Sequence, residues 1–157
     1  MKAEYINPFL NAAKNVIQTM SRIDVKGGKP QLKVGNTTFG KVSGIIGMAS
    51  ANIAGNMVIS FQEKCILNIV ANMLMEEPKT SIDNDVVDAV GELTNMICGG
   101  AKAELSKLGH TFDLATPTMV VGENIEITNY SDAPTIVIAL STEHGDFVLE
   151  ANFSEHS

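Results

Sequence analysis

The sequence has no tryptophan, few aromatic residues and only two cysteines, and each shortage argues against a kind of site. Aromatic residues make up 5% of the 157 residues, so neither a stacking platform for bases nor an aromatic sugar-binding cleft is expected. Cys65 and Cys98 form no CxxC pair and no Cys/His cluster at metal-ligand spacing. We therefore predict two reduced cysteines that pack in helices, and no bound metal.

Positive charge and long apolar runs are also scarce. The chain has 11 Lys plus Arg against 18 Asp plus Glu, a net charge of −7 that repels polyphosphate backbones. The longest apolar stretch, residues 42–54, is broken by serine, glycine and asparagine and is shorter than the roughly 20 residues of a membrane helix. No secretory signal is visible at the N-terminus. We expect a cytoplasmic protein that binds neither nucleic acid nor membrane.

The chain reads as one continuous domain, residues 1–157, without a linker, repeat or low-complexity tract. Apolar residues at helical spacing predict three helices: one over residues 8–20, one that ends before Pro78, and one over residues 83–108. Runs rich in β-branched residues predict strands at residues 41–50, 52–60, 118–121, 125–128, 135–140 and 147–153. The expected fold class is α+β, an antiparallel-rich sheet with helices packed on one face.

Local signals predict where these helices begin and end. Asn7 before Pro8 is typical of a helix start, with a capping side chain before a residue suited to the first turn. Ser60 and Glu63 have the spacing of a capping box for the second helix. The long helix opens with acidic residues and is predicted to stop at Gly109.

The long helix has two contrasting sides when its residues are placed about 100° apart. One side is apolar and predicted to be buried: Val86, Val90, Leu93, Ile97, Ala101, Leu105 and Leu108. The opposite side carries Asp88, Glu92, Asn95 and Gly99. These four residues follow one another at spacings of four, three and four, so they are expected to stack closely on an outward face.

The middle of the long helix contains five poor helix formers: Gly91, Thr94, Asn95, Gly99 and Gly100. Relative to alanine they forgo several kcal/mol, on the order of 1 kcal/mol for each glycine. A sequence that breaks a local rule without a packing benefit marks a candidate functional site. The glycines also clear side chains from the surface, so the backbone of another protein can approach.

Simpler interpretations of this helix stay open. Glu92 and Asn95 can be ordinary surface residues, and Asp88 with Glu92 would make only a weak divalent-ion site. A calcium loop starting at Asp83 fails, because its sixth and twelfth positions are Asp88 and Thr94. No nucleophile-elbow or nucleotide-binding motif is present. An enzyme built on this chain would therefore use an amide and a carboxylate.

The sequence resembles the CheX branch of the CheC/CheX/FliY family of chemotaxis phosphatases. The family pattern is Asp or Ser, then Glu four positions on, Asn three further and Pro about 22 beyond, and this chain has Asp88, Glu92, Asn95 and Pro117. The surrounding residues 90–96 and 117–122 are also similar to the family. The first helix as predicted, residues 8–20, has no second ExxN, which is typical of CheX-like rather than CheC-like members, and the match at Glu4 to Asn7 just before Pro8 is taken as accidental.

The resemblance implies a protein substrate, the aspartyl phosphate of a phosphorylated CheY-type response regulator. It implies that Asn95 orients the attacking water, that Glu92 contributes to catalysis and anchors the partner, and that Asp88 and Gly99 lie at the partner contact. Pro117 would give structural support. Mg²⁺ would be carried by the receiver domain, and two copies would form a homodimer. The alternative is a non-catalytic module, similar to flagellar switch proteins, that binds a phosphorylated receiver.

Overall fold

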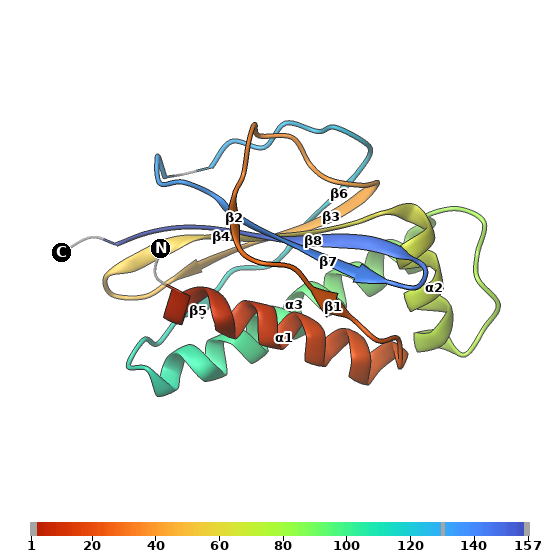
Figure 1. Cartoon of the computed structure of the whole chain (residues 1–157), viewed down its shortest axis with the longest axis horizontal. Helices are drawn as coiled ribbons and strands as arrows, with labels where there is room; N and C mark the ends of the chain where they lie inside the picture. Colours follow the sequence, from red (N-terminus) through yellow and green to blue (C-terminus); the bar gives the residue numbers. More distant parts are fainter. Residues whose placement is uncertain (1–2, 130, 156–157) are drawn as a thin grey trace.

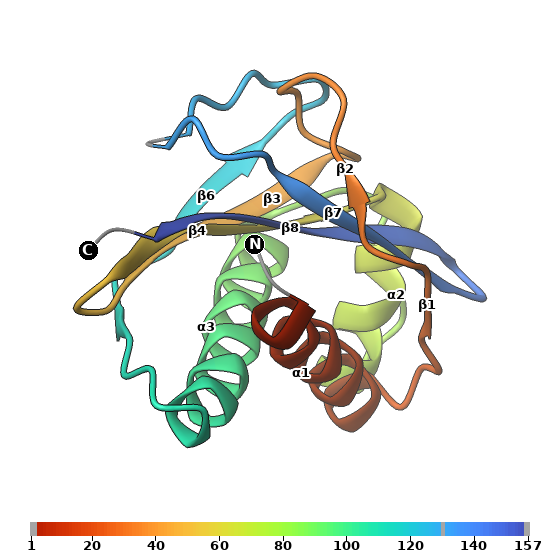
Figure 2. The same cartoon turned by 60° about the vertical axis from the view of Figure 1, so that its left-hand side comes forward.

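The computed structural model describes residues 3–129 and 131–155, which form one antiparallel sheet with helices on one face (Figures 1 and 2). The helices are α1 (Ala3–Ser21), α2 (Glu63–Leu74) and α3 (Asn84–Lys107). The strands are β1 (Lys26–Gly27), β2 (Gln31–Leu32), β3 (Val42–Ala49), β4 (Ile53–Phe61), β5 (Asp113–Leu114), β6 (Thr118–Val121), β7 (Ile136–Thr142) and β8 (Gly145–Glu155). The predicted fold class is confirmed.

The sheet is ordered β1-β7-β8-β4-β3-β5, and all its strand pairs are antiparallel. The short strand β2 also pairs with β7, and β6 pairs with β3 at the other edge. The hairpins β3–β4 and β7–β8 supply the long central strands, since antiparallel strands can be joined by tight turns. No helix of the described residues is long and apolar enough to cross a bilayer.

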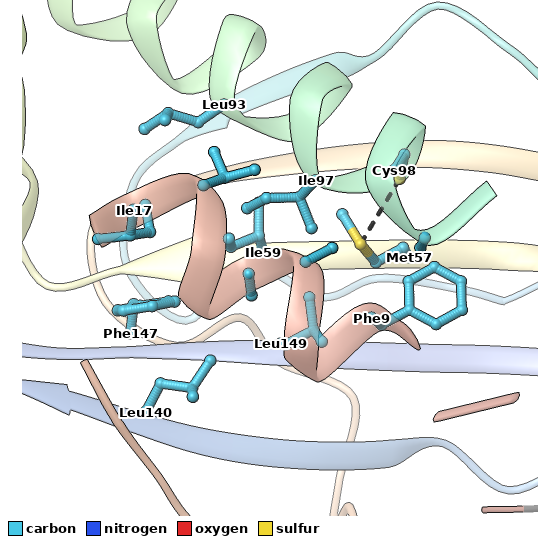
Figure 3. Packing of buried hydrophobic residues seen from close by; sticks show 14 of the residues in the cluster. Phe9, Ile17, Met57, Ile59, Leu93, Ile97, Cys98, Leu140, Phe147 and Leu149 are labelled. Carbon is cyan, nitrogen blue, oxygen red and sulfur yellow. Dashed lines mark hydrogen bonds between the residues drawn. The ribbon is translucent and has the colours of Figure 1, made fainter. Parts of the chain in front are cut away.

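One face of the sheet buries the apolar side of α3 (Figure 3). Leu93 and Ile97 are fully buried, and they belong to the same core as Ile59 of β4. The Cys98 thiol lies 3.5 Å from Met57 Sδ on β4. The predicted buried stripe of α3 is confirmed except at Leu108, which is 49% exposed because the helix ends one residue earlier.

The other face of the sheet is crossed by the connections β2–β3 and β6–β7 (Figure 2). Lys33, in the first connection, forms an ion pair of 2.7 Å with the buried Glu150 of β8. Asn152 Nδ2 donates to Ala133 O, in the second connection, at 2.7 Å. These polar contacts fasten the two long connections over the sheet and leave the helical layer on the other side.

Two predicted helix starts are wrong. The first helix begins at Ala3, and Pro8 lies inside it, because Tyr5 and Ile6 are buried and extend the apolar stripe towards the N-terminus. The capping box at Ser60 does not form. Ser60 is the penultimate residue of β4, where its hydroxyl bonds Ser43 Oγ at 2.6 Å, and Gln62 is the N-cap of α2.

The long predicted strands match β3, β4, β6, β7 and β8, whereas the strand predicted at 125–128 is wrong. There the chain makes only an isolated pairing between Thr37 and Glu126, because it serves as a connection above the sheet. The two-residue strands β1, β2 and β5 were not predicted, since two residues are too short to show a period-two pattern.

Both cysteines are free and fully buried, and this burial predicts that their thiols react slowly in the folded protein. Desolvation raises the pKa of the Cys65 thiol to about 11 and that of the Cys98 thiol to about 12, so almost no thiolate forms at pH 8. We expect a disulfide reagent to label the folded protein far more slowly than the urea-unfolded chain. Rapid labelling of both thiols in the folded state would contradict this packing.

Candidate functional site

The site lies on α3, and its helix start is well defined. Asp83 is the N-cap, and its carboxylate accepts a hydrogen bond from Val86 N at 3.0 Å. Lys79 Nζ lies 2.8 Å from Asp83 Oδ2 and 3.1 Å from Asp85 Oδ2. Hydrogen bonds from Lys79 and from Val86 N hold the pKa of Asp83 below its usual value. These contacts fix the N-terminal end of α3, which precedes the candidate residues.

The four residues predicted to face outward are all exposed: Asp88, Glu92, Asn95 and Gly99. At about 100° per residue they occupy a sector of roughly 60° on the helix, and they span roughly 16 Å along its axis. Within the described residues, the side chains of Asp88, Glu92 and Asn95 form no hydrogen bond or ion pair with the rest of the chain. Two carboxylates and one amide are therefore free to bind a partner.

Packing explains two of the five poor helix formers, Thr94 and Gly100, so that part of the prediction was wrong. Thr94 is fully buried, and its hydroxyl donates to Val90 O at 2.7 Å. A methyl group on Gly100 would lie 3.2 Å from Ala12 Cβ, which shows that this glycine lets α1 approach α3. At Gly91 packing does not require glycine, because a methyl group would lie 3.5 Å from Met119 Sδ of β6, an ordinary contact.

Asn95 and Gly99 have no such packing role. Asn95 is exposed, and a methyl group added to Gly99 would have no neighbour within 4 Å. Mid-helix glycine with an open surface is about 1 kcal/mol less favourable than alanine. Packing therefore leaves the helix-propensity cost of Gly91, Asn95 and Gly99 unexplained, and the last two lie on the outward face.

Pro117 precedes β6, the strand that lies against α3. It is half-buried and directly precedes β6, whose first residue pairs with Ile45 of β3. Met119, two residues further on, is the residue whose sulfur lies near Gly91 of α3. Pro117 is thus at the start of the strand that flanks the site, with its φ fixed by its ring.

The shape of the outward face suits a macromolecule better than a small ligand. Enclosed ligand sites are concave, whereas Asp88, Glu92 and Asn95 stand on an exposed helix surface. Hollows of about 610 and 420 Å³ lie elsewhere, the first beside Ala115 and the second beside Arg22. Among the described residues, no three His, Cys, Asp or Glu side chains come together as a group suited to a metal ion.

Comparison with known proteins identifies the family of this fold and helix face. The family model described as chemotaxis phosphatase CheX matches residues 42–141, a segment that includes the whole of α3. The CheY-P phosphatase CheX of Thermotoga maritima is 27% identical over 149 residues, 95% of each chain. The family match and the shared fold place the chain among the CheC-like chemotaxis proteins. The chain belongs to the CheX family.

Solved structures agree with this assignment. A CheC-like superfamily protein from Shewanella sp. PV-4 is 45% identical, with a TM-score of 0.91 over 98% of this chain and 99% of that one. The CheX of Borrelia burgdorferi, solved as a complex with CheY, BeF₃ and Mg²⁺, is 26% identical, with a TM-score of 0.82 over 96% of this chain and 98% of that one.

Proposed function

We propose that this protein is a phosphatase that hydrolyses the aspartyl phosphate of a CheY-type response regulator. The observation that carries the proposal is the exposed pair Glu92 and Asn95, three residues apart on one face of a helix whose other side is buried. The CheY complex of the Borrelia relative supports a receiver domain as the partner. In this proposal residues 1–157 act as one phosphatase domain in the cytoplasm.

Hydrolysis of an acyl phosphate needs a water molecule in line with the phosphorus–oxygen bond that breaks. A protein that holds this water in place lowers the barrier by positioning alone. The Asn95 amide oxygen accepts a proton of the water in a hydrogen bond, and the amide stays neutral over the whole working pH range. No covalent intermediate on this chain is required, and the phosphate leaves from the receiver's own aspartate.

Glu92 is suited to anchor the docked receiver. It lies about 4.5 Å along the helix axis from Asn95, close enough for both side chains to contact one phosphorylated site. The Glu92 carboxylate can form a charge-assisted bond with a lysine beside the phosphoryl group. Asp88, one turn further towards the N-terminus, adds a weaker contact. Mg²⁺ in this proposal is held by the acidic residues of the receiver.

Replacement of Asn95 tests the function directly. Asn95→Ala should leave binding to the phosphorylated receiver mostly intact and slow phosphate release on the order of 100-fold, the cost of losing a positioned polar group. Glu92→Ala should weaken binding as well as rate, because a charge-assisted contact is lost. The measurement is loss of label from a phosphorylated CheY-type receiver, together with the dissociation constant of its beryllofluoride form.

The matched control is Asn84→Ala, which removes an exposed amide from the first turn of the same helix and should change neither quantity. Wild-type turnover in Asn95→Ala would refute the assignment of Asn95. If the wild-type protein binds the receiver but releases no phosphate, the chain is a binding module and the proposed activity is wrong.

Gly99 is proposed to let the receiver approach the helix backbone, and two substitutions test this role. Gly99→Ala should raise the melting temperature, because alanine favours the helix by about 1 kcal/mol and its methyl group meets no neighbour. Gly99→Leu should raise the dissociation constant of the receiver, because its side chain occupies the approach. Gln18→Leu, at an exposed position of α1, is the control. Equal receiver affinity in Gly99→Leu and wild type would contradict this role.

We also propose a homodimer in which two sheets join edge to edge and each subunit offers one site. Strand β6 supports this arrangement, because it is at a sheet edge, pairs with β3 on one side and ends in Val121, which is 53% exposed. Light scattering should give about twice the chain mass of 16.7 kDa. Val121→Lys should shift the protein towards monomer, since charged edge residues oppose strand pairing. A wild-type monomer at the same concentration would contradict the proposal.

A further inference from the structure

A close contact between α3 and the sheet lies on the buried side of the helix. Gly44 of β3 and Thr94 of α3 face each other there, and a methyl group on Gly44 would overlap Thr94 Oγ1. It would also lie 3.2 Å from Thr94 Cβ and 3.3 Å from Thr94 Cγ2. Cβ atoms are rarely found so close to non-bonded atoms, so any side chain at position 44 would require α3 or β3 to move.

Both partners of this contact are held in place. Gly44 pairs with Ile59 of β4 on one side and with Met119 of β6 on the other, so β3 can recede only if its neighbouring strands bend with it or the pairing is disturbed. Thr94 is fully buried, and its hydroxyl donates to Val90 O one turn earlier. The threonine cannot turn away without leaving that hydroxyl buried and unpaired, which is costly.

Thr94 lies in sequence between the two residues proposed to act on the substrate, Glu92 and Asn95. Because a helix is stiff over a single turn, a displacement at Thr94 is passed to its neighbour Asn95. Two looser contacts flank this point, Gly91 with Met119 of β6 and Gly100 with Ala12 of α1. Of these three glycine positions, Gly44 leaves the least space, so its contact with Thr94 sets how closely the helix approaches the sheet near Asn95.

We infer that Gly44 and Thr94 are positioning residues: their contact fixes the distance of Asn95 from the sheet and so the place where its amide meets the attacking water. This inference rests on the proposed function and goes beyond it, because neither residue reaches the outward face. Water in line with a scissile bond tolerates little displacement, and a shift of about 1 Å can cost on the order of 100-fold in rate.

The experiment is a cycle of substitutions measured by single-turnover hydrolysis at saturating phosphorylated receiver. Gly44→Ala should lower the rate constant about 10- to 100-fold, with a smaller change in receiver affinity. Thr94→Ala removes the opposing side chain, so the double variant Gly44→Ala/Thr94→Ala should recover much of the lost rate. If Gly44→Ala does not fold, the double variant should still exceed Thr94→Ala in rate, since the added methyl group fills the space left by threonine.

A control separates positioning from loss of stability. Ile46→Ala removes a fully buried side chain from β3, two residues beyond Gly44. It should lower the melting temperature, because it leaves a cavity, and leave the single-turnover rate unchanged well below that temperature. A wild-type rate in folded Gly44→Ala, or an equal loss of rate in Ile46→Ala, would overturn the inference. So would a double variant no faster than its single parents.

The Asn95→Ala background distinguishes this inference from the proposed function. If Gly44 acts through Asn95, adding Gly44→Ala to Asn95→Ala should cause no further fall in rate. Full additivity of the two losses would overturn the positioning role and leave the role of Asn95 in place. Wild-type turnover in Asn95→Ala alone would instead mean that the proposed function of Asn95 is wrong.

Discussion

Burial of one side of α3 against the sheet is the constraint on which the rest of the site depends. Leu93 and Ile97 lie fully buried in the core shared with β4, so the helix has one stable rotation about its axis. That rotation presents Glu92 and Asn95 to solvent. Neither side chain needs a partner within the protein to point outward, because the apolar face determines where the polar face must lie.

The outward face of the candidate site could be predicted from the sequence because its residues lie on one helix. The 3.6-residue period fixes which residues share a face, so Asp88, Glu92, Asn95 and Gly99 could be grouped without knowing what packs behind them. The long strands β3, β4, β7 and β8 could also be predicted, because their sequences are runs rich in β-branched residues. The first residues of the helices were harder to predict. Pro8 has the sequence signature of a first turn, yet α1 begins five residues earlier, at Ala3, because Tyr5 and Ile6 are buried.

Contacts between distant segments could not be predicted in the same way. The poor helix propensity of Thr94 and Gly100 looked like a mark of function, but it reflects the close approach of β3 and α1. The need for glycine at position 44 could not be recognised within its β-rich run, because it arises from contact with Thr94 of α3, fifty residues further along the chain. The helix face alone leaves the partner open, and the CheY complex of the Borrelia burgdorferi relative is what supports the proposed CheY-type receiver.

The central claim is that the Asn95 amide places a water molecule in line with a phosphoryl group carried by another protein. The most direct measurement is a crystal structure of this chain bound to a beryllofluoride-activated CheY-type receiver. We expect Asn95 Oδ1 within hydrogen-bond distance of a water opposite the bond from beryllium to the receiver's aspartate, with Glu92 beside it. A complex in which α3 lies outside the interface would contradict the account.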